Sequence, residues 1–308
     1  MTASMRSILV LIIIGSLPCL FLTSLSIGDA DVGPQQVLNY FFGEKITSID
    51  RLVIQDIRMP RALAAVLTGA ALGISGAMLQ GMLRNPLASP FLLGISSGAG
   101  VCVVILFAFN VAAFWIPVGA WLGAVVAAAL VFFISYQRQH ISLERLILAG
   151  VAVSSVLGSI QAIFLLRSDD TRIQNSLTWL SGTLAARTWD DLAFTWVPIV
   201  VCIVASLAFA KQLNLALLDD DTSQSLGLSL IKLRLMVGFI ATILTACAVC
   251  ISGLVGFVGL VIPHMGRLVC GSNFMYVLPM SGLMGGVVLL GADALARTYL
   301  WELPVGLV

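Results

Sequence analysis

Few side chains in this sequence are of a type and spacing that could do chemistry. Cys247 and Cys250 have the Cys-x-x-Cys spacing of a redox pair or half a zinc site, but no second Cys or His pair follows them. His140 and His264 each stand alone at the end of an apolar run. All six cysteines lie in or beside apolar segments, where we expect them to act as small packing residues. The sequence therefore predicts no resident metal, no cofactor and no disulfide.

A nucleotide site is also missing from the sequence. A P-loop needs a Gly-Lys-Ser/Thr run to cradle phosphates, and no lysine of this chain follows a glycine. Asp293 is the one acidic residue inside an apolar run, and Arg297 follows it by one helical turn. We favour an ion pair between these two residues over a proton-coupling role for Asp293. An intramembrane enzyme would need a paired nucleophile and base or a metal cluster, which the sequence lacks.

The composition indicates what kind of structural elements contain these residues. The chain has 308 residues, of which 59% are hydrophobic and only 10% are charged. A soluble domain has about 25% charged residues, so the sequence predicts a polytopic membrane protein. The net charge is +1 and the basic residues are dispersed, which argues against nucleic-acid binding.

Runs poor in charge predict nine membrane spans in a single all-α transmembrane domain covering residues 1–308. Hydropathy alone leaves one or two helices open for 235–271, because only Gly and Pro interrupt that stretch. Lys and Arg divide evenly between the two sides, so their count does not fix the orientation. The expected spans are 7–27, 62–83, 91–110, 112–135, 146–166, 192–210, 235–254, 255–271 and 276–296.

The second of these spans carries the most specific pattern. Arg58, Arg61 and Arg84 bracket a run without charge, in which Gly69, Gly73 and other small residues leave one flank nearly free of side chain. Small residues let neighbouring helices approach closely in lipid, so we expect this span to pack at the centre of the bundle. RNPLASP follows it, and its first proline blocks continuation of the helix.

Three blocks of the chain resemble the FecCD-type permeases of bacterial ABC importers. They are residues 58–100, GLVGFVGLVIPHMGRL at 253–268, and LPMSGLMGGVVLLGADALAR at 278–297 followed by ELPVG at 302–306. RNPLASP and WLSGTLAARTW are closest to a ferric-citrate or iron-siderophore permease subunit. The resemblance implies a type II importer permease of about ten helices with the N-terminus inside. It also implies two helices in 235–271, and a tenth helix that starts at 302–308 and is cut short, so we expect a fragment of a longer protein.

The longest expected cytoplasmic loop, 213–234, shows spaced apolar residues where a solvated loop would be polar. Such residues indicate a partner surface, with a loop resting on the membrane as the alternative. In the resembling family this loop carries the coupling helices that dock on the ATPase. The expected coupling residues are Leu215, Leu218, Asp219, Ser225, Leu226, Gly227 and Leu228.

The resemblance also implies a cytoplasmic gate and an outer docking face. Each group also has a plainer interpretation. The gate residues could simply form a tight turn, and the polar residues of 146–166 could form hydrogen bonds between helices. The arginines could anchor their helices at the membrane interface. Expected gate and pathway residues are Asn85, Leu87, Leu143, Glu144, Ser154, Ser155, Ser159 and Gln161. Expected docking residues for a substrate-binding protein are Arg58, Arg61 and Arg297.

The resemblance implies the membrane-spanning subunit of an importer for an Fe(III)-siderophore or ferric-citrate complex in the bacterial inner membrane. Haem or cobalamin is the alternative cargo, and an ion-gradient-driven secondary transporter is the alternative mechanism. The expected partners are a second permease subunit, identical or paralogous, two cytoplasmic ATPases that hold the ATP, and a substrate-binding protein. The chelator would supply the ligands of any transported iron.

Overall fold

The computed structural model describes residues 3–28, 30, 32–137, 140–299 and 303–307. The described chain is almost entirely helical, as the composition predicts, with one two-residue antiparallel bridge between β1 (Tyr136–Gln137) and β2 (His140–Ile141). The helices are α1 (Ala3–Ser26), α2 (Pro34–Phe42), α3 (Ser48–Leu52), α4 (Met59–Leu83), α5 (Ile95–Ala108), α6 (Trp115–Ser135), α7 (Leu143–Leu166), α8 (Asp170–Leu180), α9 (Trp189–Ala193), α10 (Trp196–Ala208), α11 (Ala210–Ala216), α12 (Asp220–Ser225), α13 (Leu230–Ser252), α14 (Val258–Cys270) and α15 (Phe274–Tyr299). Short 3₁₀ turns occupy Pro90–Leu93 and Val305–Leu307, and a π-helical turn occupies Val53–Arg58.

Nine helices of the described chain match the nine predicted spans in order. Seven spans are long and apolar enough to cross a membrane, with α9 and α10 counted together as Trp189–Ala208, while α5 and α14 are apolar but shorter. The stretch that hydropathy left open holds two helices, because α13 ends at Ser252 and α14 begins at Val258. Gly253, with φ of 70°, makes the break in a conformation that favours glycine.

Helix α4 lies at the centre of the bundle, as its small residues predict. Every residue from Ala71 to Leu83 is buried, and α4 packs against α13, α14 and α15. A Cβ at Gly69 or Gly76 would overlap the backbone of α15 or α14, so these contacts require glycine. Thr245 of α13 donates a hydrogen bond to Ser75 of α4 at 3.0 Å, which adds a buried polar tie.

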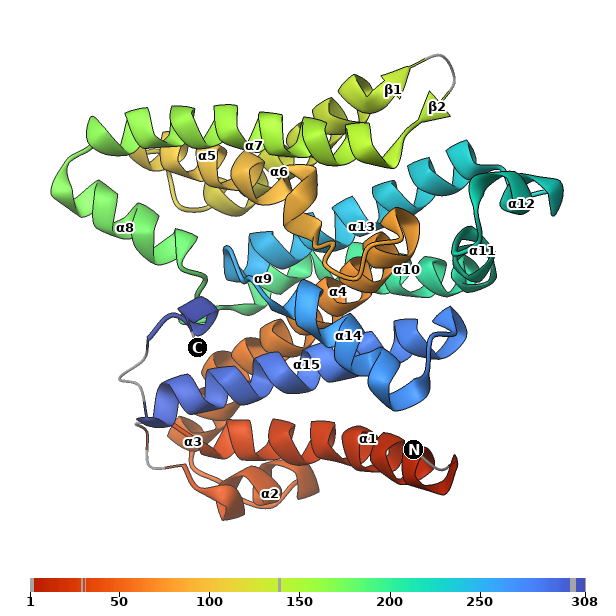
Figure 1. The fold of residues 1–308 in the computed structure, drawn as a ribbon. Helices are drawn as coiled ribbons and strands as arrows, with labels where there is room; N and C mark the ends of the chain where they lie inside the picture. The colour runs from red at the N-terminus through yellow and green to blue at the C-terminus, as the bar shows by residue number, and fades with distance from the viewer. Residues whose placement is uncertain (1–2, 29, 31, 138–139, 300–302, 308) are drawn as a thin grey trace.

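The other long helices lie on either side of this centre. Helices α5, α6 and α7 form one group above it, and α1 lies below α15 on the opposite side (Figure 1). Helix α1 is peripheral, with only 11% of its spanning window buried. The start of α1 and helices α11 and α12 lie at the right of the view, while α3 and α8 lie at the left (Figure 1). We call these the inner and outer ends, following the expected orientation.

The segments between the spans depart from the sequence-based bounds in two places. The expected second span, 62–83, is the end of a helical stretch that begins at Ser48 and passes through the π-helical turn into α4. The expected start of a tenth span falls on 302–308, of which residues 302 and 308 lie outside the described residues. Val305–Leu307 form a single 3₁₀ turn there.

Candidate functional site

The 213–234 segment forms a compact unit at the inner end. Asp219 caps α12, because its Oδ2 accepts hydrogen bonds from the backbone N–H and the hydroxyl of Thr222, both at 3.0 Å. These bonds, the backbone one foremost, hold the pKa of Asp219 below its usual 3.8. Ser223 of α12 donates to the carbonyl of Leu215 of α11 at 2.9 Å. Gly227, with φ of 85°, ends the unit.

The apolar residues expected to contact an ATPase divide into two groups. Leu218 and Leu226 are 41% and 58% exposed, and their neighbour Leu217 is exposed too. Leu215 and Leu228 are half-buried and support the unit from within. The remaining expected coupling residues, Asp219, Ser225 and Gly227, are exposed. A polar unit that exposes leucines is suited to be covered by a partner, and the coupling role of these residues stays a prediction.

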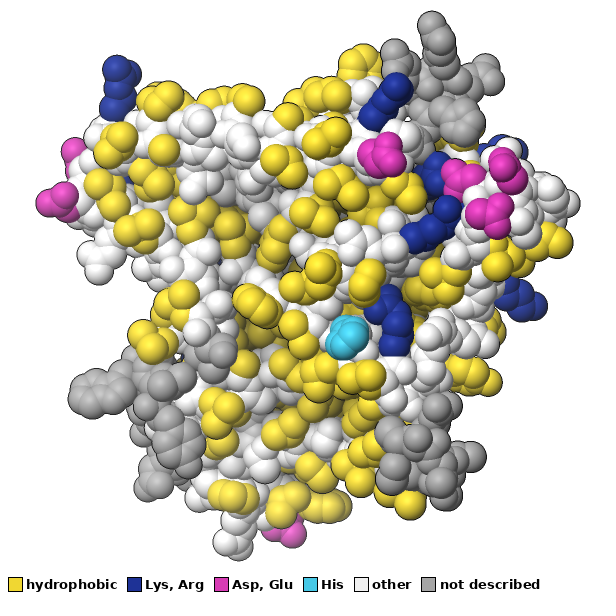
Figure 2. Space-filling view, in the orientation of Figure 1, with side chains coloured by type: hydrophobic (Ala, Val, Ile, Leu, Met, Phe, Trp, Pro, Cys, Tyr) yellow, Lys and Arg dark blue, Asp and Glu magenta, His cyan; other side chains and the backbone are white. Residues whose placement is uncertain are grey.

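Asp220, which the sequence analysis did not single out, fixes α12 to the bundle. Its Oδ1 lies 2.7 Å from the guanidinium of Arg84 at the end of α4, and its Oδ2 lies 3.0 Å from that of Arg234 in α13. Burial raises the pKa of Asp220, but the hydrogen bonds and charges of the two arginines outweigh it and lower the pKa below 3.8. Figure 2 shows basic and acidic side chains gathered at this end of the molecule.

The gate residues expected at the inner end come from two separate helix ends. Asn85 follows α4, and its Oδ1 accepts a hydrogen bond from the backbone N–H of Leu87 at 2.9 Å. Leu87 is 73% exposed. Leu143 and Glu144 open α7, with Leu143 half-buried and Glu144 exposed. The geometry at Asn85 agrees with a tight turn, which was the plainer interpretation of these residues. Their role in a gate stays a prediction.

A cavity of about 480 Å³, lined by both charged and apolar side chains, adjoins the turn after α4. The buried amide of Gln80 donates to the carbonyls of Ala88 and Leu260 at 3.2 and 3.0 Å, and its oxygen accepts from Arg267 at 2.7 Å. Gln80 therefore ties α4, the turn and α14 together while it holds the guanidinium of Arg267 at the cavity wall. His264 also lines this cavity. The sequence signal that could have drawn attention to Gln80 was a lone amide in an uncharged apolar span, since such a side chain needs hydrogen-bond partners when it is buried.

The four polar residues expected along the transport pathway all lie in α7 but face two directions. The Ser154 hydroxyl lies close to Gly94, and the Gln161 side chain lies close to Gly100, so both face the 94–108 region. Ser155 and Ser159 are exposed, and their hydroxyls donate to Val151 and Ser155 carbonyls of their own helix at 2.9 Å. The four residues therefore form two groups. Ser154 and Gln161 are seven apart and Ser155 and Ser159 are four apart, so each pair shares a side, whereas neighbouring residues such as Ser154 and Ser155 lie about 100° apart around the helix. The pathway role of each residue stays a prediction.

Arg58 lies at the outer end but is a buried residue. Its guanidinium donates to the carbonyls of Leu25, Ala30 and Val32 at 2.7–2.9 Å, and to that of Gly28 at 3.4 Å. These carbonyls belong to the last turn of α1 and the segment after it, where the helix dipole is negative. Arg58 is therefore buried, and its donors hold the end of α1, which the sequence did not predict. Its docking role stays a prediction.

Arg61 and Arg297 share the carboxylate of Asp293. Asp293 lies 3.0 Å from Arg61 and 3.2 Å from Arg297, and its side chain is 1% exposed. Arg297 also donates to the carbonyls of Ser24 and Ile27. The predicted ion pair of Asp293 with Arg297 is confirmed, whereas the second ion pair, with Arg61, was not predicted from the sequence. Arg61, with a side chain 14% exposed, is the most accessible of the three arginines, and docking stays a prediction.

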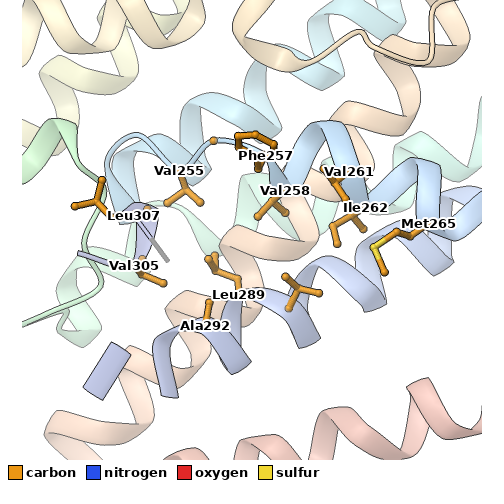
Figure 3. A pocket seen from close by; sticks show the side chains of 13 residues that line it. Val255, Phe257, Val258, Val261, Ile262, Met265, Leu289, Ala292, Val305 and Leu307 are labelled. Atoms are coloured by element: carbon orange, nitrogen blue, oxygen red, sulfur yellow. The ribbon is translucent and has the colours of Figure 1, made fainter. Parts of the chain in front are cut away.

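An apolar cavity of about 620 Å³ lies between α14, α15 and the 305–307 turn. Figure 3 shows Val258, Ile262 and Leu289 lining it. Its lining residues include no charged or polar side chain, so it is unsuited to a charged chelate. Among the described residues, no group of three His, Cys, Asp or Glu side chains comes together to hold a metal ion.

The long apolar helices around a glycine-packed centre, with a capped and leucine-bearing unit fixed to the inner end, define a multi-pass helical membrane protein. The particular family follows from comparison with known proteins. The sequence profile of the FecCD transport family matches residues 11–308, and the chain belongs to this family. It is the permease subunit of an ABC importer of the FecCD type.

Three similar proteins illustrate the range of the family. The hemin transport system permease protein HmuU of Yersinia pestis is 38% identical over 82% of this chain and 78% of its own length. The Fe(3+)-citrate import system permease protein YfmD of Bacillus subtilis is 35% identical over 92% of this chain and 85% of its own length. A solved structure of a metal-chelate type ABC transporter in an inward-facing conformation matches with a TM-score of 0.86 and 32% identity, over 96% of this chain and 92% of that chain.

Family membership decides between the mechanisms that the sequence left open. A gradient-driven transporter and an intramembrane enzyme are both set aside, since the family is one of ABC permeases. The structure agrees, because the buried carboxylate of Asp293 forms ion pairs with two arginines, as the favoured structural role requires. The predicted membership of the FecCD family, the predicted helical permease fold and the predicted inner-membrane location are confirmed.

Proposed function

We propose that this permease carries an Fe(III)-siderophore or ferric-citrate complex across the inner membrane, driven by ATP hydrolysis on a separate ATPase subunit. The observation that supports this cargo is the similarity to a permease named for Fe(3+)-citrate import, over 92% of the chain. The chelator supplies the ligands of the iron, so the permease needs to recognise only the outer surface of the complex.

The ATPase partner is supported by the form of the inner unit. Leu218 and Leu226 are exposed on a unit held rigid by the Asp219 cap and by the Asp220 ion pairs. Apolar side chains on a pre-organised polar surface are typical of anchors that insert into a partner. The ATP of the working importer is bound by this partner.

A substrate-binding protein and a second permease subunit complete the proposed assembly. Capture at the outer end would depend chiefly on Arg61, because Arg58 and Arg297 are more deeply buried. Exposed charge pairs act mainly on the association rate and its salt dependence, so we expect capture to weaken as salt rises.

Uptake in proteoliposomes that hold the permease, its ATPase and its binding protein tests this proposal. Labelled ferric citrate, hydroxamate and catecholate chelates, haem and cobalamin are offered singly, with and without ATP inside the vesicles. ATP-dependent uptake of an iron chelate is the expected result. Uptake of haem or cobalamin alone would replace the cargo, and uptake that needs no ATP would overturn the mechanism.

A further inference from the structure

We propose that Asp220 is a positioning residue that links the ATPase-facing helix α12 to the turn after α4, so that movement of α12 displaces this turn. This inference rests on the proposed function, because it assumes that an ATPase moves α12. It adds to that function a link between two regions that the sequence analysis treated separately, the loop at 213–234 and the turn at Arg84–Leu87.

The link consists of one carboxylate between two guanidinium groups. The Oδ1 of Asp220 lies 2.7 Å from Arg84, and its Oδ2 lies 3.0 Å from Arg234. Arg84 also donates through Nε to the carbonyl of Ala216, the last residue of α11. Arg84 thus contacts both helices of the inner unit. Charge-assisted bonds of this kind are shorter and more directional than neutral ones.

Arg84 belongs to the backbone of the turn itself. It caps α4 with φ of 49°, in the left-handed region that residues other than glycine rarely adopt. Pro86 follows two residues later and restricts Asn85, whose side chain holds the N–H of Leu87. A pull on the guanidinium of Arg84 is therefore applied at the first residue of a stiff turn that ends in the exposed Leu87.

The inner unit is stiff enough to transmit such a displacement. Ser223 bonds α12 to Leu215 of α11 at 2.9 Å. Asn214 of α11 donates to the side chain of Asn273 and accepts from the backbone N–H of Phe274, both at 2.9 Å. The unit is therefore attached to α15 as well as to α4 and α13. Asp220 of α12 forms the ion pairs with Arg84 at the end of α4 and with Arg234 in α13.

The role of Asp220 is separable from the formation of α12. Asp219 caps the helix and Asp221 is exposed in its first turn, so α12 keeps its capping bonds when Asp220 is changed. Replacing Asp220 by Asn keeps its size and removes its charge. If Asp220 were purely structural, this change would lower transport and ATPase binding together. If Asp220 is a link, the change lowers the amount of substrate transported for each ATP hydrolysed.

The experiment measures the number of ATP molecules hydrolysed for each substrate imported, in the assembled importer in proteoliposomes. D220N should raise this ratio about fivefold or more, a typical size for coupling between two sites, while the ATPase still co-purifies. D221N, the neighbouring acid, should match the wild type, and D220E should restore most of the coupling. Arg84→Gln should raise the ratio as D220N does, and the double variant should be no worse than either single variant.

The outcomes separate this inference from the function on which it rests. If the wild-type importer shows no ATP-dependent uptake, the proposed function fails. If the wild type is coupled and D220N and Arg84→Gln both keep its ratio, only the link is overturned. Additive effects of the two changes would also overturn it, because residues that act through one ion pair do not add. If D220N fails to assemble, Arg84→Gln with the same readout decides.

Discussion

Removal of the buried charge of Asp293 should be the most damaging single substitution at the outer end. D293N leaves Arg61 and Arg297 without the carboxylate that lies 3.0 and 3.2 Å from them. Breaking a buried ion pair by removing one partner costs about 3–5 kcal/mol, because the remaining charge stays buried. Since about 1.4 kcal/mol is a tenfold change, the unfolded fraction should rise by roughly a hundredfold or more. Arg297 also holds the end of α1, so we expect α1 to loosen first.

The assay is unfolding of the purified permease in mixed micelles of increasing SDS fraction, followed by tryptophan fluorescence. The matched control is D169N, which removes a carboxylate 79% exposed and 3.5 Å from Arg172. An exposed pair contributes about 0–1 kcal/mol, so this control should unfold close to the wild type. The reasoning is refuted if D293N and D169N lower the free energy of unfolding by similar amounts.

Three further substitutions or conditions test other parts of the structure. Gly76→Val should cost about 3 kcal/mol of folding free energy, because its Cβ overlaps the α14 backbone, whereas Gly158→Ala meets open space and should change the SDS midpoint little. Leu226→Glu should weaken ATPase binding by about 2 kcal/mol in a binding titration without lowering folding stability, since Leu226 is 58% exposed; unchanged affinity would exclude Leu226 as an anchor. The pKa values of Asp219 and Asp220 lie below 3.8, so their contribution to the inner unit is complete above that pH and is lost as pH falls through the lowered values. Hydrogen-exchange protection of α12, corrected for the intrinsic rate, should be constant from about pH 8 to about pH 5; a decline within that range would contradict this assignment.

The sequence alone determined the features that depend on local composition and period. Runs without charge located nine helices, because burying a charge in lipid is costly whatever the fold around it. Small residues at Gly69 and Gly76 identified the helix that packs most closely. Asp293 and Arg297 could be paired from spacing alone, since residues four apart lie on one side of a helix.

The sequence could not decide which distant residues meet. Arg61 reaches Asp293 from α4, and Asp220 reaches Arg84 from α12, although nothing in the local pattern of either pair points to the other. The burial of Arg58 could not be predicted for the same reason, because only the folded chain brings the carbonyl end of α1 to its guanidinium. Local propensity fixes where helices form in lipid, whereas partners across the bundle depend on how the helices pack. The tertiary structure alone therefore decided which arginines hold helices together and which remain accessible to a partner.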